Sequence, residues 1–166
     1  MARTSTMKKA TNIADWRDSS PVYTVVLVTG GFDPVHSGHV SLMREAKEFG
    51  DELWVGVNSN EWLTRKKGKP FMSLHERLIV VASIRYVSKA LDLFDKDDTA
   101  NNLIQFVLDT TNYNIVFANG GDRGKGNTPE FMAFNKNPRV DFAWGVGGSE
   151  KKNSSSKILD DWKNSP

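Results

Sequence analysis

YTVVLVTGGFDPVHSGH, residues 23–39, joins an apolar run to a glycine turn and two histidines. Residues 23–28 are mostly β-branched or apolar, which is typical of a strand buried on both faces, as in a parallel sheet. The sequence Thr29-Gly30-Gly31 breaks that strand. A helix is then expected from about Gly38 to Phe49, where apolar residues recur at helical spacing. Strand, turn and helix in this order predict the beginning of an α/β fold.

The rest of the chain repeats this alternation. Further strands are expected at 53–57, 87–94, 115–118 and 142–146, and further helices at 73–84, 101–110 and 154–162. Ser73 is the expected N-cap of the helix at 73–84, with Glu76 completing a capping box. Residues 61–71 are polar and basic, and indicate a loop or an irregular helix. The pattern predicts a single α/β domain over residues 21–166, Rossmann-like with a doubly wound and mainly parallel sheet, after a polar N-terminal extension at 1–20.

The composition is that of an ordinary globular protein. Of the 166 residues, 39% are hydrophobic and 25% are charged, which is enough apolar material for a core. The formal net charge of +2 gives no global basic field, so we expect no nucleic acid partner. No apolar run approaches the ~18 residues of a membrane span, and residues 1–9 lack the apolar stretch of a signal peptide. We therefore expect a cytoplasmic protein that does not bind a membrane.

The turn after the first strand carries groups that suit phosphate. Its glycines and Gly38 let a ligand approach the backbone closely, and the helix that begins there offers N–H groups. His36 and His39 lie three residues apart, so both imidazoles can face the same side. Metal ligands or plain surface residues are the alternatives. Zinc is disfavoured, because the one remaining histidine is His75 and the chain has no cysteine, so no metal ligand is assigned.

Residues 30–39, GGFDPVHSGH, match G-x-F-D-x-x-H-x-G-H, a form of the HxGH signature. On this string the chain resembles the cytidylyltransferase-like nucleotidyltransferase superfamily. The resemblance implies that His36 and His39 are catalytic, holding the phosphates of a nucleotide and stabilising the transition state at its α-phosphorus without a covalent enzyme intermediate. It also implies nucleotide contacts from the neighbouring residues Gly30, Gly31, Phe32, Asp33 and Gly38.

Three segments after the second strand extend the resemblance. Residues 65–70 match a family loop whose lysines contact phosphates, which implies a catalytic role for Lys67 and a substrate contact for Lys66; a solvated loop is the alternative. Arg77 matches an arginine that reaches phosphates of substrate or nucleotide in the family, and it would be free to do so because Glu76 serves the capping box. Asn58 lies in a segment similar to that of heptose 1-phosphate adenylyltransferases and is expected to bind substrate.

Two later turns complete the expected nucleotide site. Residues 119–122, Asn-Gly-Gly-Asp, resemble the K-G-G-D turn of the heptose enzymes, where base and ribose lie. Residues 154–158, SSSKI, resemble the second family signature, S-[ST]-[ST]-x-I, in which hydroxyls and helix N–H groups hold the β- and γ-phosphates. A flexible linker is the alternative for the serines. The nucleotide contacts implied by these two turns are Gly120, Gly121, Asp122, Ser154, Ser155 and Ser156.

The resemblance implies transfer of a nucleoside monophosphate from a triphosphate to a small phosphorylated acceptor, with release of pyrophosphate. The turn at 119–122 favours ATP as the donor and a sugar phosphate such as a heptose 1-phosphate as the acceptor. The segment at 84–87 instead favours CTP with glycerol 3-phosphate or a similar alcohol phosphate. A nucleotide-binding protein without turnover is a third possibility. Mg²⁺ is expected to enter with the triphosphate, and a homodimer is expected.

Overall fold

The computed structural model describes residues 22–121, 123–148 and 154–165. Its strands are β1 (Thr24–Gly30), β2 (Glu52–Val57), β3 (Lys89–Asp92), β4 (Asn114–Gly120) and β5 (Val140–Val146). They form one sheet in the order β3-β2-β1-β4-β5, and every neighbouring pair is parallel. The chain moves outward from β1 to β3 and then returns to place β4 on the other side of β1. The predicted Rossmann-like, doubly wound parallel sheet is confirmed.

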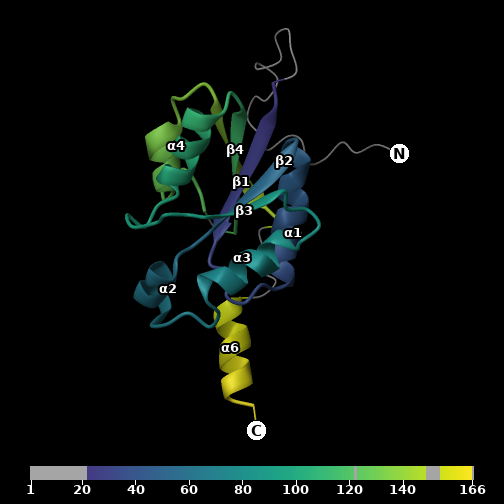
Figure 1. The fold of residues 1–166 in the computed structure, drawn as a ribbon, viewed down its shortest axis with the longest axis vertical. Helices are drawn as coiled ribbons and strands as arrows, with labels where there is room; N and C mark the ends of the chain where they lie inside the picture. The colour runs from purple at the N-terminus through teal and green to yellow at the C-terminus, as the bar shows by residue number, and fades with distance from the viewer. Residues whose placement is uncertain (1–21, 122, 149–153, 166) are drawn as a thin grey trace, which may run out of the picture.

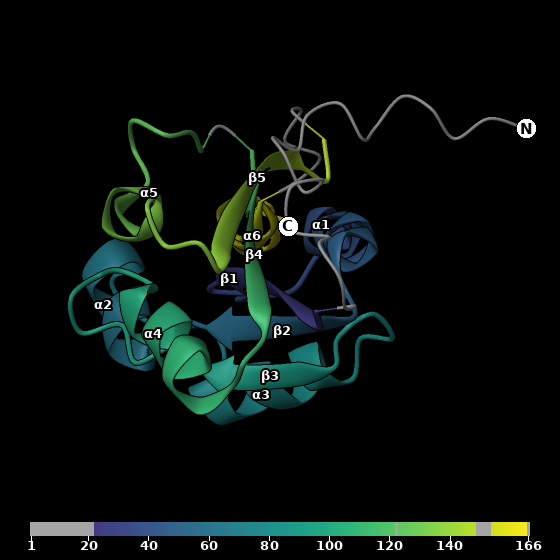
Figure 2. The ribbon, with the colours of Figure 1, turned by 90° about the horizontal axis from the view of Figure 1, so that it is seen from above.

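Helices cover both faces of this sheet (Figures 1 and 2). On one face lie α1 (Ser37–Ala46, continued by a 3-10 turn at Lys47–Phe49) and α3 (Leu74–Ala82). The other face is covered by α4 (Asn101–Thr110) and α5 (Pro129–Phe134). Beyond the carboxyl ends of the strands lie α2 (Asn60–Lys67) and α6 (Ser155–Lys163). Among the described residues, no helix has both the length and the apolar character needed to cross a membrane.

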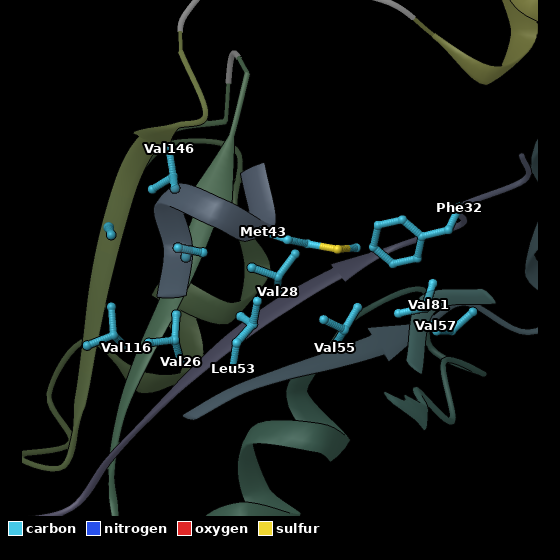
Figure 3. Packing of buried hydrophobic residues seen from close by; sticks show 13 residues of the cluster. Val26, Val28, Phe32, Met43, Leu53, Val55, Val57, Val81, Val116 and Val146 are labelled. Carbon is cyan, nitrogen blue, oxygen red and sulfur yellow. The ribbon is translucent and has the colours of Figure 1, made fainter. Parts of the chain in front are cut away.

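Alternation along β1 gives the sheet two cores. Val26 and Val28 pack on the side of α1, whereas Val25 and Leu27 pack on the side of α4, and all four are fully buried. Figure 3 shows the first core, where Met43 of α1 lies over valines of β1 and β2. Burying one such side chain contributes roughly 1.5–3 kcal/mol. A strand that is covered on both sides has to be apolar throughout, which explains the run at the start of the sequence.

Three elements differ from the sequence-based expectations. Residues 60–67 form a regular helix rather than a loop or an irregular helix. Ser59 caps it by accepting the N–H of Trp62, and Gly68 ends it at a φ of +89°. The short helix α5, with Pro129 at its first position, is not predicted by the pattern. β1 continues through Gly30, past its expected end. Ser73 caps α3 as expected, and the extension at 1–20 lies outside the described residues.

Candidate active site

A cavity of about 710 Å³ opens at the carboxyl ends of β1, β4 and β5. After β1 the chain adds β2 and β3 on one side of the sheet, and after β4 it adds β5 on the other side. In such a sheet a crevice forms between the two strands at which the strand order reverses, here β1 and β4. Five segments that are far apart in the sequence meet there: the histidine turn, the end of α2, the turn after β4, the end of β5 and the start of α6. The lining residues are Thr29, Gly30, Phe32, His36, Gly38, His39, Leu42, Lys67, Ala118, Asn119, Gly120, Gly121, Arg123, Val146, Gly147, Gly148, Ser154, Ser155 and Ser156.

Backbone hydrogen bonds hold the two histidines at the start of α1. His36 is the N-cap, and its Nδ1 accepts the N–H of Gly38 at 3.1 Å. The Nδ1 of His39 accepts the N–H of His36 at 3.3 Å, and the two rings stack with centroids 3.7 Å apart. Because each Nδ1 is an acceptor, the ring hydrogen of a neutral imidazole sits on Nε2. Both imidazoles line the cavity, so the site contains two Nε2–H donors.

His39 is held in its uncharged form. Burial lowers its pKa, and the positive charge that a protonated His36 would carry and that of Lys67 act in the same direction, so that the pKa falls to about 3. Phe32 contributes to this burial, since its ring lies edge-on to His39 with 4.9 Å between centroids. The same ring covers Gly30, where a Cβ atom would come within 3.0 Å of it. Glycine at position 30 therefore lets the aromatic ring pack closely against the histidine, and a side chain there would have to displace the ring.

The described part of the lining suits an anion. It contains the cations Lys67 and Arg123 and no aspartate or glutamate. Two helices begin at the cavity, α1 at Ser37 and α6 at Ser155, and each directs backbone N–H groups and the positive end of its dipole toward this region. The volume lies within the roughly 300–1,000 Å³ of small-molecule sites. A ligand with several phosphates matches both the size and the charge of this cavity.

A family model described as cytidylyltransferase-like matches residues 27–137, more than half of the chain. This chain belongs to the cytidylyltransferase-like family. The match includes the histidine turn, α2 and the turn after β4, and therefore most of the segments that meet at the cavity.

Relatives within the family carry different names. FAD synthase of Archaeoglobus fulgidus is 42% identical over 83 residues, 50% of this chain and 59% of that protein. Bifunctional protein HldE of Nitrosococcus oceani is 37% identical over 111 residues, 66% of this chain and 21% of that protein. Ethanolamine-phosphate cytidylyltransferase of Arabidopsis thaliana is 33% identical over 88 residues, 52% of this chain and 21% of that protein. The chain thus spans less than two thirds of these relatives, and their names do not agree on a substrate.

Solved structures share the fold. The lipopolysaccharide core biosynthesis protein of Thermoplasma volcanium superposes with a TM-score of 0.56 at 24% identity, over 74% of this chain and 95% of that chain. A putative nicotinate-nucleotide adenylyltransferase of Vibrio parahaemolyticus gives a TM-score of 0.50 at 18% identity, over 84% of this chain and 86% of that chain. At these identities the likeness concerns the fold alone.

Arg77 does not reach the cavity of this cytidylyltransferase-like chain. The expectation that its side chain is free to face the site is wrong, because the residue is fully buried and its guanidinium is surrounded by acceptors from its own protein. Its hydrogen bonds connect the segments after β1 and β2 to the start of α3, and so stabilise the segments next to the cavity. The acceptors are the carbonyl oxygens of Gly31 (3.0 Å), Asn58 (2.6 Å) and Met72 (3.1 Å) and Oδ1 of Asn60 (2.8 Å).

Asp33 is also occupied within the protein. The residue is 2% exposed, and its two carboxylate oxygens accept the N–H groups of Phe71 and Met72, each at 2.7 Å. It does not line the cavity, contrary to the nucleotide contact expected from the signature. Its carboxylate instead fastens the segment between α2 and α3 beside the histidine turn.

Three further expected contacts lie outside the large cavity. Asn58 is buried, and its Nδ2 donates to Asp95 at 2.7 Å. Lys66 is on the surface, with Nζ 3.8 Å from a carboxylate oxygen of Asp98. Gly31 and Asn58 border a second, smaller cavity of about 100 Å³. Lys67, the next residue of α2, does line the large cavity. The two lysines differ because the side chains of neighbouring helical residues point about 100° apart.

The three serines at the start of α6 all line the large cavity but make different contacts. The Oγ of Ser154 is the N-cap and accepts the N–H of Lys157 at 3.1 Å. Ser155 is buried, and its hydroxyl donates to the carbonyl oxygen of Pro34 at 2.8 Å. Ser156 is exposed. Two of the three hydroxyls thus contribute to the fold at this end of the cavity, which the signature alone did not indicate.

The turn after β4 reaches the cavity through Gly120 and Gly121, whereas Asp122 lies outside the described residues. A Cβ atom at Gly120 would meet the carbonyl oxygen of Val146 at 3.2 Å, so this glycine permits close packing rather than leaving room for a base. Gly121, at a φ of +64°, has open space around it. Arg123 lines both cavities and was missed by the sequence reasoning; its position directly after the glycine turn is the signal for it.

Proposed function

We propose that the chain transfers a nucleoside monophosphate from a nucleoside triphosphate to a small phosphorylated acceptor and releases pyrophosphate. The observation that carries this proposal is the described lining of the large cavity, which combines two histidine donors, two cations and two helix N-termini with no carboxylate. Relatives named as a cytidylyltransferase and as a synthase of a dinucleotide support transfer chemistry over simple binding.

In the proposed reaction an oxygen of the acceptor phosphate attacks the α-phosphorus of the triphosphate. A new P–O bond forms, the bond between the α-phosphorus and the bridging oxygen breaks, and pyrophosphate leaves with that oxygen and the bonding electrons. Negative charge grows on the α-phosphate oxygens and on the leaving group. His36, His39 and Lys67 would stabilise this charge as donors that are already in position. The acceptor phosphate is ionised, so no general base is needed.

Mg²⁺ fits this site as a companion of the triphosphate. The described lining offers it no carboxylate, and in the described part of the chain no group of three or more histidine, cysteine, aspartate or glutamate side chains is placed to hold a metal. Phosphate oxygens and water would supply its ligands, and its charge would offset that of the departing pyrophosphate.

For the donor we propose ATP rather than CTP, with a sugar phosphate as the acceptor. The open space beside Gly121 favours the larger purine, and the turn itself resembles that of the heptose enzymes. The alternative is CTP with an alcohol phosphate. It is supported by the similarity to ethanolamine-phosphate cytidylyltransferase.

Pyrophosphate release tests both parts of the proposal. ATP and CTP are supplied separately and in equal mixture, with glucose 1-phosphate, glycerol 3-phosphate and ethanolamine phosphate as acceptors. We expect ATP to exceed CTP by about tenfold or more in kcat/KM, a difference of only ~1.4 kcal/mol in transition-state binding. Preference for CTP would overturn the donor and keep the reaction class. Nucleotide binding without turnover of any acceptor would instead favour a non-catalytic protein.

A further inference from the structure

The second cavity, of about 100 Å³, lies on the other side of the carboxyl end of β1 from most of the large cavity. The two cavities share Thr29, Gly30 and Arg123 in their linings, so they adjoin. Its other walls come from the end of β2, α2, the segment before α4, and α5. A ligand that extends past the end of β1 from the phosphate region would therefore enter this space.

Glu130 is the unusual member of this lining. The residue is 3% exposed, and its Oε1 accepts the N–H of Ala100 at 2.7 Å, at the start of α4. Its Oε2 is buried and has no hydrogen-bond partner in the structure. A buried carboxyl oxygen without a donor is costly, and such atoms are rare in folded proteins. Oε2 therefore requires a donor that the described residues do not supply.

Two other polar side chains of this cavity already have partners. The amide of Asn58 donates to Asp95 at 2.7 Å, and the carboxylate of Asp98 is 2.8 Å from Arg65. Oε2 of Glu130 is a buried acceptor of this lining without a partner, and a carboxyl oxygen is matched by an O–H or N–H group. The volume of about 100 Å³ admits a few heavy atoms, such as one end of a sugar or a whole shorter head, and excludes a nucleoside.

We propose that this second cavity holds part of the carbon-bearing head of the phosphorylated acceptor, and that this part carries a hydroxyl or ammonium group that donates to Oε2 of Glu130. The inference rests on the proposed function, since the phosphate of the same molecule would reach past Gly30 to the large cavity. Arg123 borders both spaces and is therefore a candidate to contact that phosphate. Glu130 is thus a specificity-determining residue for the acceptor.

Calorimetric binding of three phosphate esters tests this assignment without turnover. Glycerol 3-phosphate carries hydroxyl donors and ethanolamine phosphate carries an ammonium donor, whereas ethyl phosphate has neither. We expect at least one of the first two to bind about tenfold or more tightly than ethyl phosphate. Equal affinities for all three, or no binding by any of them, would overturn the proposal with the unaltered protein.

Glu130→Gln then tests the residue. Glutamine keeps an oxygen for the N–H of Ala100 and replaces the other oxygen with a donor, so we expect the fold to survive and the advantage over ethyl phosphate to vanish. Glu48→Gln, an exposed change in the 3-10 turn after α1 that lines neither cavity, is the matched control. An advantage that persists in Glu130→Gln would overturn the role of this residue. Pyrophosphate release reports separately on the proposed function, so the two failures are distinguishable.

Discussion

His39 is a neutral imidazole whose Nδ1 is taken by the backbone, so Nε2–H is the group that it can offer a ligand. We expect His39→Ala to lower kcat by about 100-fold or more, as the loss of one oxyanion donor does, while the fold survives. Steady-state kinetics with the best donor and acceptor measure the effect. His75→Ala is the matched control, because His75 is exposed and lines neither cavity. Near-normal turnover in His39→Ala would end the catalytic assignment.

The low pKa of His39 also links stability to pH. The folded protein holds the pKa at about 3 against an ordinary 6.5, so the fold favours the neutral ring. Its contribution is complete above pH 6.5 and is lost as the pH falls toward 3, because the unfolded chain then binds a proton that the folded one rejects. We expect the free energy of unfolding of the parent, relative to His39→Asn, to rise with pH in that window by at most about 1.4 kcal/mol per unit. Urea titrations of both proteins measure it, and parallel pH profiles would contradict it.

Arg77 is expected to matter for stability in the absence of any ligand. Arg77→Lys keeps the charge but cannot satisfy the carbonyls of Gly31, Asn58 and Met72 together, because lysine lacks the planar fork. We expect a loss of about 2 kcal/mol or more in the free energy of unfolding, measured by urea denaturation. Arg85→Lys, an exposed change just after the same helix, should cost little. Unchanged stability with weaker phosphate binding would restore the role first inferred from the sequence.

Sequence reasoning found the histidines because their chemistry is local: a strand, a glycine turn and a helix start within seventeen residues. It misplaced Arg77 and Asp33 because their partners come from other segments. Asp33 binds N–H groups 38 and 39 positions away, and Arg77 reaches back 46 positions to Gly31. A motif shows which residues a family uses, but not whether a side chain serves the ligand or the protein that surrounds it.

The serines at the start of α6 have different roles: Ser154 caps the helix, whereas the exposed Ser156 lines the cavity without capping it. We expect Ser156→Ala to weaken triphosphate binding by about two- to tenfold, the value of one neutral hydrogen bond, with an unchanged Tm. Ser154→Ala should instead remove the helix cap and cost about 1 kcal/mol of stability. Calorimetric binding and thermal unfolding separate the two effects. Unaltered affinity in Ser156→Ala would return this residue to a purely structural reading.

The elements that could be predicted are those with a strong period. The helix at 101–110 was located to the residue because its apolar face packs on the sheet, with Leu103, Ile104 and Val107 buried. The pattern leaves α2 open between a loop and an irregular helix because its only buried residue is Leu63, so it has almost no apolar stripe. α5 is six residues long, too short for a period to appear.

The described lining of the large cavity offers few groups that could bind a metal ion, and this determines how we expect the activity to depend on metals. With no carboxylate in the described lining, we expect activity to need Mg²⁺ or Mn²⁺ brought by the triphosphate and to vanish with a chelator. Elemental analysis of the purified protein tests whether the histidines bind a metal themselves, and we expect that no zinc copurifies. A stoichiometric zinc ion would contradict the view that the histidines bind phosphate.

The strand order also has a consequence for how the protein folds. Thr24 of β1 pairs with Asn114 of β4, whereas the other pairings join strands that follow one another in the sequence. Closing the longest loop carries the largest entropic cost, and non-local pairings are the slow steps of folding. The cavity lies across that junction. We therefore expect β1 to β3 to assemble early as the chain leaves the ribosome, and the binding site to form only after β4 and the elements that follow it have docked.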